Sequence, residues 1–175
     1  MKRFLACLLL VGTSAAAQTS ALRGHDTDAP IDFDAARIEV RNADSQAVLS
    51  GDVKIRQSDM TLDADNVTIF YDRPKTGNPT VKRLDAKGNV RLTSPSENAT
   101  GRYGIYDVTQ KQITLIGDVV LKQGDSQLRG QRLAIDLDSG RSTLDGASRG
   151  GTDAAPAAGG RVSGRFVVPP RNPTK

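Results

Sequence analysis

Polar and apolar residues alternate along most of the chain after its first 33 residues. In residues 36–41, for example, Ala, Ile and Val alternate with Arg, Glu and Arg. A period of two is typical of a β-strand with one buried face. Between breaks rich in Gly, Pro, Asn, Asp and Ser, it predicts strands at 34–42, 46–57, 60–71, 81–93, 98–108, 111–123, 126–138 and 141–145. Helical periodicity is not sustained beyond residue 17, so we expect an all-β fold.

One five-residue phrase occurs three times, at 51–55, 88–92 and 117–121. Its pattern is Gly, then Asp or Asn, then Val, any residue, and Ile or Leu. A small residue follows each phrase at an equal distance: Ala64, Gly101 and Gly130. Each repeat thus corresponds to about one antiparallel hairpin with its connector. Because one hairpin cannot close its own core, the repeats are expected to stack side by side.

The alternation changes phase once within each repeat. Apolar positions around each repeated glycine share one parity, and the small residue downstream has the other. A strand can keep one face buried across such a step only by inserting an extra residue. We therefore predict a β-bulge or a change of face near Asp65, Arg102 and Gln131.

The first 17 residues have the three-part layout of a secretory signal peptide. Lys2 and Arg3 precede an apolar run at 4–11, and three alanines end at Ala17. We expect cleavage between Ala17 and Gln18 and export of the chain. The apolar run is much shorter than the ~20 residues of a membrane-spanning helix, and a retained anchor is the alternative.

The remaining chain divides by composition into three parts. Residues 18–33 are polar and contain Gly24 and Pro30, so we expect a flexible lead-in. Residues 34–146 form the predicted β-domain, which is long enough for one core. Residues 147–175 are rich in Ala, Gly and Pro, and we expect a low-complexity tail with at most one late strand at 161–168.

Cysteine content and charge restrict the possible functions. Cys7 lies in the leader, so the chain after it has neither a disulfide nor a cysteine metal site. Without Lys2 and Arg3, the 24 basic residues fall to 22, against 20 acidic residues. Charges of opposite sign alternate along the strands, which indicates a solvated face rather than a nucleic-acid-binding patch.

Few residues are suited to catalysis. His25, the one histidine, falls in the lead-in, where we expect it to be exposed. The pairs Asp63/Asp65 and Asp136/Asp138 could each face a cation from one side of a strand, but turn chemistry explains them more simply. A secreted enzyme that uses such a pair is an alternative hypothesis. The sequence favours a protein with no enzymatic activity and no cofactor.

The most extensive candidate site is an apolar stripe of aliphatic residues on one face of the predicted strands. Two interpretations are open: the solid core of a structural β-solenoid, or a lining with room for a lipid. Nothing in the sequence joins the first strand to the last, so both ends of the sheet are expected to be open. The stripe comprises Ile38, Val40, Val53, Ile55, Val67, Ile69, Val90, Leu92, Ile105, Val119, Leu121, Leu133 and Ile135.

These patterns together resemble a known family, the LptA (OstA-like) family of periplasmic lipopolysaccharide transport proteins. The resemblance covers about residues 30–146. The segments that carry it are Ala36 to Val40, Leu49-Ser50-Gly51-Asp52-Val53, Leu62 to Asp65, Leu84 to Val90, Ala99 to Tyr103, Tyr106-Asp107 and Leu115 to Val119. The tail from Gly150 onward has no counterpart in the family pattern.

The resemblance implies an open, twisted β-jellyroll built from repeated antiparallel hairpins. In this family the apolar interior holds the acyl chains of lipopolysaccharide, and the jellyrolls join head to tail. The resemblance also implies periplasmic localisation, with an LptC-like inner-membrane protein and an LptD-like outer-membrane translocon as partners. It implies no cofactor and no covalent chemistry.

Overall fold

The computed structural model describes residues 22–146 and 161–165. Within these residues the one helical element is a 3-10 turn, η1 (Asn42–Asp44). The strands are β1 (Asp32–Asp34), β2 (Arg37–Arg41), β3 (Gln46–Gln57), β4 (Met60–Asp72), β5 (Thr80–Thr93), β6 (Glu97–Asp107), β7 (Gln112–Gln123), β8 (Ser126–Asp136), β9 (Ser142–Asp145) and β10 (Ser163–Arg165). The all-β prediction is confirmed, and β3 has the predicted bounds.

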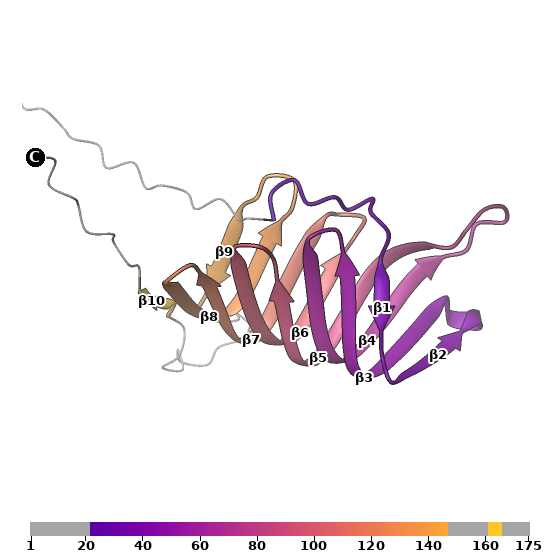
Figure 1. Cartoon of the computed structure of the whole chain (residues 1–175), viewed down its shortest axis with the longest axis horizontal. Coiled ribbons are helices and arrows are strands. Elements are labelled where there is room, and N and C mark those ends of the chain that lie inside the picture. The colour runs from indigo at the N-terminus through magenta and orange to yellow at the C-terminus, as the bar shows by residue number, and fades with distance from the viewer. Residues whose placement is uncertain (1–21, 147–160, 166–175) are drawn as a thin grey trace, which may run out of the picture.

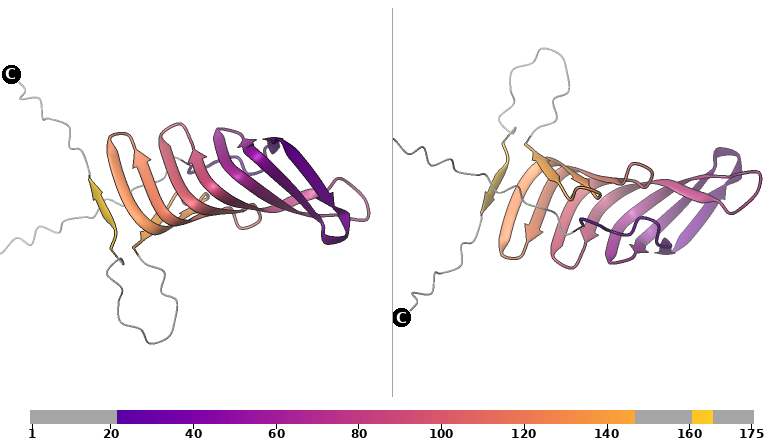
Figure 2. Two further views of the ribbon diagram at one scale, coloured as in Figure 1. Left: turned by 90° about the horizontal axis from the view of Figure 1, so that it is seen from below. Right: turned by 90° about the horizontal axis from the view of Figure 1, so that it is seen from above.

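All ten strands belong to one antiparallel sheet. Its order is β1-β3-β4-β5-β6-β7-β8-β10, with β2 also paired to β3 and β9 also paired to β8. From β3 to β8 the sheet is therefore a meander of hairpins (Figure 1). Each long strand bends sharply near its middle, so the sheet folds into two facing layers that run along the molecule (Figures 1 and 2).

The bends coincide with the bulges that the sequence predicts. Two residues of β3, Gly51 and Asp52, lie opposite the single residue Asp65 of β4. The same arrangement recurs where Gly88-Asn89 faces Arg102 and where Gly117-Asp118 faces Gln131. The extra residue belongs to the repeated phrase rather than to the strand opposite it. The three bulges form the corner at which the two layers meet.

Glycine is required at this corner for two independent reasons. Gly51, Gly88 and Gly117 have φ values of 83°, 81° and 84°, a region that residues with a Cβ rarely adopt. A Cβ on Gly88 would also lie 2.2 Å from the Asp65 carboxylate, and one on Gly117 would lie 2.6 Å from Arg102 Nε. The next residue has positive φ as well, which explains why Asp or Asn follows each glycine.

We name the two layers by the strand segments on either side of this corner. Half-sheet A comprises β1, β10 and residues 53–57, 60–64, 90–93, 97–101, 119–123 and 126–130. Half-sheet B comprises β2, β9 and residues 46–50, 66–72, 80–87, 103–107, 112–116 and 132–136. The apolar residues of both layers form one core cluster between them.

One prediction about the ends of the domain needs correction, and another is confirmed. The described part of the lead-in is not a free segment: residues 22–31 pack on the domain, and β1 begins at Asp32. The sheet is open at both ends as expected: β10 extends it beyond β8, and within the described residues β10 does not pair with β1. β10, at Ser163–Arg165, lies inside the range 161–168 where one late strand was considered. The predicted leader and the rest of the tail lie outside the described residues.

Candidate functional site

The interior between the half-sheets collects most of the predicted apolar stripe. Each of these residues is at most 8% exposed: Val53, Ile55, Val67, Ile69, Val90, Leu92, Val119, Leu121, Leu133 and Ile135. Half-sheet A supplies Val53, Ile55, Val90, Leu92, Val119 and Leu121, and half-sheet B supplies the others. The stripe is thus one continuous surface that lines both walls.

Two members of the stripe lie at one end of this interior. Ile38 and Val40 are on β2, the last strand of half-sheet B, and pair with the inward-facing Leu49 and Ala47 of β3. They are 47% and 54% exposed, because no further strand lies beside β2. Phe33 of β1 is 49% exposed at the same end of half-sheet A. This end presents the interior wall to solvent.

The prediction was wrong for Ile105, which lies on the opposite face of the sheet. Its register partners are Asp85 and Thr114, whereas the next residue, Tyr106, pairs with the inward-facing Leu84 and Ile113. The pleat places neighbouring residues on opposite faces, so only one of the two can face inward. The repeat itself indicates the right residue, since Tyr106 occupies the position of Ile69 and Ile135.

The stripe also omitted several interior residues. Leu49, Leu84 and Leu115 are fully buried, and Tyr106 and Leu137 are nearly so. Each of them occupies a position that is apolar in all three repeats, so the repeat alignment could have identified them. With them, the buried cluster spans both layers without interruption. In the described residues the two walls are in contact through this cluster, and the interior wall meets solvent at the β1/β2 end.

The long side of the interior opposite the corner is crossed by residues 22–31, which we call the N-terminal strap (Figure 1). Its Leu22 is 1% exposed and belongs to the core cluster. The Gly24 amide donates to the carbonyl of Leu137, at the end of half-sheet B, over 3.1 Å. Gln57 Nε2, at the end of half-sheet A, donates to the carbonyls of Thr27 and Ala29, both over 2.9 Å. The strap therefore ties the free margins of the two layers together.

A polar cluster lies beneath the strap and crosses the interior. Tyr106, from half-sheet B, donates its hydroxyl to Gln57 Oε1 of half-sheet A over 2.8 Å. His25 lies 3.0 Å from Asp59 Oδ1 through Nδ1 and 3.3 Å from Gln57 Oε1 through Nε2. The His25 side chain is fully buried, so the expectation of an exposed residue was wrong. Burial and the nearby negative charge of Asp28 raise the pKa of Tyr106 to about 12, so this phenol stays a neutral donor.

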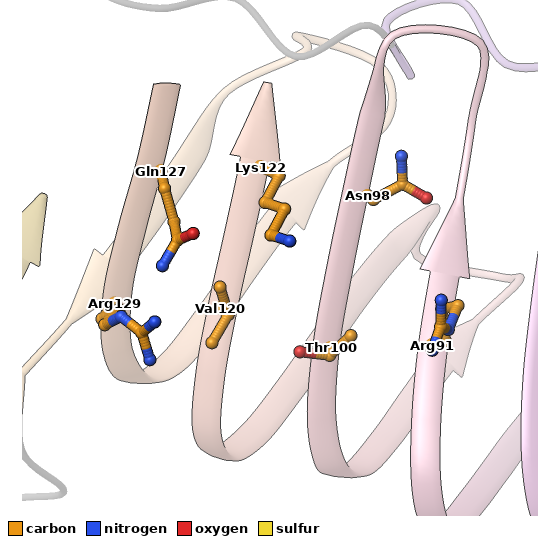
Figure 3. Close-up of a pocket in the computed structure, with 7 residues that line it drawn as sticks. All are labelled: Arg91, Asn98, Thr100, Val120, Lys122, Gln127 and Arg129. Atoms are coloured by element: carbon orange, nitrogen blue, oxygen red, sulfur yellow. The ribbon is translucent and has the colours of Figure 1, made fainter. Parts of the chain in front are cut away.

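The outer face of half-sheet A carries a shallow basic hollow (Figure 3). Arg91, Lys122 and Arg129 surround Thr100 and Val120, with Asn98 and Gln127 at the margin. Within the described residues, none of these three cations forms an ion pair. At the same face near β1, by contrast, Lys54 lies 3.6 Å from Asp63. Positive charge thus accumulates toward the β8 end of half-sheet A.

The carboxylate pairs considered for catalysis are used structurally. Asp136 accepts hydrogen bonds from the backbone amide and hydroxyl of Ser139, which lower the pKa of Asp136. Asp138 lies 3.2 Å from Lys111, and Asp65 accepts from the Asn89 amide at the corner. The described residues contain no cluster of three or more side chains suited to a metal ion. They also include no helix with the length and hydropathy to cross a membrane.

Three comparisons relate this architecture to known proteins. Residues 32–141 match the model of the family described as LptA/(LptD N-terminal domain) LPS transport protein. An uncharacterized protein of Rhizobium meliloti (strain 1021) is 32% identical over 162 residues, which cover 87% of this chain and 81% of that relative. The crystal structure of LptH from Pseudomonas aeruginosa, the LptA homologous periplasmic component of a lipopolysaccharide transport device, has a similar fold. Its TM-score is 0.68 at 21% identity, over 81% of this chain and 98% of that one.

The repeated hairpins, the glycine corner and most of the aliphatic interior fall within the matched residues. The family model covers well over half of the chain, and the resemblance inferred from the sequence is confirmed. The chain belongs to the LptA/(LptD N-terminal domain) family of lipopolysaccharide transport proteins.

Proposed function

We propose that this protein is a non-catalytic periplasmic carrier that binds lipopolysaccharide between its half-sheets and forms part of a bridge from the inner to the outer membrane. The observation that carries the proposal is the continuous aliphatic lining of both walls. Membership of a lipopolysaccharide transport family and the predicted leader support it. An LptC-like inner-membrane protein, an LptD-like translocon and further copies of this chain, joined head to tail, are the proposed partners.

The interior suits this role on energetic grounds. Exposing one methylene group to water costs about 0.8 kcal/mol, so an acyl chain of a dozen methylenes faces roughly 10 kcal/mol in an aqueous compartment. Aliphatic side chains remove that cost through contacts that have no preferred direction. A lipid can therefore move along such a lining without breaking specific bonds. Because the walls are in contact, binding requires them to separate.

The N-terminal strap is where we expect that separation to be controlled. It joins the margins of the half-sheets through Gly24, Thr27 and Ala29, and its Leu22 fills part of the interior. Acyl chains that enter from the long side must displace this segment. The strap is short and lies at the surface, so its release disrupts few of the strand pairings of the sheet.

Site-specific photocrosslinking tests the proposal. A photoreactive residue at Ile38, which is half-exposed and tolerates a larger side chain, should capture lipopolysaccharide. The neighbouring Arg37 is 74% exposed and is the matched control on the outer face of β2. A second pair, Val53 and Lys54, repeats the comparison inside the molecule. Capture at the outer positions, or at none of the four, would contradict the proposal.

The contact between the two walls also supports a second candidate, a structural periplasmic module with a solid core. An apolar fluorescent probe distinguishes the two candidates in protein freed of lipid. A carrier should take up the probe and release it when lipopolysaccharide is added. A solid core should exclude the probe throughout.

A further inference from the structure

The outer edge of β8 pairs with two strands, one along each of its halves. The two strands differ in the length of chain that connects them to β8. β9 pairs with residues 132–135 in half-sheet B, and β10 pairs with residues 127–129 in half-sheet A. β9 follows β8 through a tight turn that is closed by a hydrogen bond from the Asp136 amide to the carbonyl of Arg141 over 3.0 Å. β10 comes from beyond residue 160, after a connector rich in Ala and Gly. It therefore has no short turn to hold it in place.

The pairing of β10 is specific, although it is short. Gly164 lies opposite Leu128, and a Cβ on Gly164 would come within 2.3 Å of Leu128 Cδ2 and 3.0 Å of the carbonyl of Gln127. Leu128 is partly buried and packs against the core cluster, so a larger residue at position 164 would have to displace its side chain. Only glycine fits this position without displacing its neighbours. All three residues of β10 are exposed, so little burial holds the strand.

The surface around β10 carries more positive than negative charge, with Asp118 and Asp125 as its acidic members. β10 lies beside the basic hollow on the outer face of half-sheet A. The hollow contains Arg129, Lys122 and Arg91, and β10 adds Arg165 to the same surface. The opposite end of half-sheet A is different, because β1 carries Asp32 and Asp34 on its outer face and the half-exposed Phe33 on its inner face. A strand with the pattern Asp-Phe-Asp would bring negative charge to Arg129 and cover Leu128 with an apolar ring.

We propose that β10 is a displaceable cover of the β8 edge, and that the β1 end of a second copy of this chain competes for the same backbone groups. This inference rests on the head-to-tail assembly in the proposed function and adds the device that limits it. β1 and β8 run in the same direction, so a second copy in the same orientation would add a parallel strand. Parallel pairing is somewhat weaker per residue, which leaves charge and Phe33 burial to favour the exchange.

A reversible covalent lock tests the cover directly. The chain from Gln18 onward has no cysteine, and Ser163 lies directly opposite Arg129. Directly opposed strand residues have Cβ atoms about 4.5–5.5 Å apart, close to disulfide geometry. The chain from Gln18 to Lys175 with Ser163→Cys/Arg129→Cys should sediment as a monomer at all concentrations when oxidised, and should assemble after reduction. Each single substitution is the control for loss of the original side chain. Equal assembly in both redox states overturns the proposal.

A second variant tests the same point without a crosslink. Gly164→Val cannot seat against Leu128, so the concentration at half-assembly should fall about tenfold. Ser163→Thr adds a methyl group on the outer face of the same strand and should leave assembly unchanged. An unchanged Gly164→Val protein would contradict the cover.

Lipopolysaccharide capture at Ile38, measured on these variants, separates the two proposals. If lipopolysaccharide is captured at Ile38 but neither β10 variant changes assembly, the cover is rejected and the carrier is not. Loss of capture in every variant and in the unmodified protein rejects the carrier.

Discussion

The two ends of the sheet are built from the same repeat, yet they expose very different surfaces. At the β1/β2 end, the inward-facing Phe33, Ile38 and Val40 are about half exposed. At the β8 end, Leu133 and Ile135 are at most 1% exposed, and β9 pairs with both of them. An inward-facing side chain is therefore buried where a further strand pairs with its own strand, and exposed where none does. The β1/β2 end therefore presents an exposed interior wall, whereas at the other end β9 and β10 already pair with β8.

The largest expected difference between the ends is in stability. Leu133→Ala removes a fully buried side chain and should lower the free energy of unfolding by about 2–5 kcal/mol. Ile38→Ala removes a half-exposed side chain and should cost less than about 1 kcal/mol. Urea unfolding followed by circular dichroism measures both. Equal losses would mean that the two ends are packed alike.

Assembly, unlike stability, should depend strongly on the exposed β1/β2 end. Ile38→Asp places a charge on the exposed inner wall of β2, where we expect a second copy to join. The dissociation constant of the oligomer should rise about tenfold or more, equivalent to about 1.4 kcal/mol, with little change in unfolding. Arg37→Asp, on the outer face of the same strand, is the matched control. Sedimentation over a range of concentrations gives the result, and an unaffected distribution would remove the β1/β2 end from the interface.

The smallest expected effect concerns charge complementarity between the ends. Arg129→Glu should weaken assembly a few-fold at low salt, because exposed pairs contribute about 0.2–1 kcal/mol. Asp34→Lys in the same chain should restore assembly if these two side chains meet between copies. High salt should reduce both effects. If the second substitution weakens assembly further, Asp34 and Arg129 are not partners.

The sequence predicted the strands and the corner because their signals are local. Alternation with a period of two sets the bounds of β3 to β8 within one or two residues. The change of phase after Ala64, Gly101 and Gly130 located the bulges. Each of these features depends on neighbouring residues along one strand, and the pleat translates it directly into a face of the sheet.

The errors concern contacts between segments that are distant in sequence. His25 is buried only because Gln57 and Asp59 meet it from a hairpin more than thirty residues away. A late strand was considered at 161–168, but its pairing with β8 was not, because a strand that follows a long connector carries no local sign of the edge it joins. Ile105 is a different case. It was assigned to the interior because it is hydrophobic, although the alternation within the repeat places Tyr106, not Ile105, on the inner face.

The glycine corner has a consequence for how this chain can change in length. Each bend is made by one Gly-Asp or Gly-Asn pair, and each pair serves the two strands of its own repeat. Insertion or deletion of a whole repeat would therefore preserve the angle between the walls and the register of all other strands. The length of the molecule can therefore change by whole repeats while its cross-section stays constant.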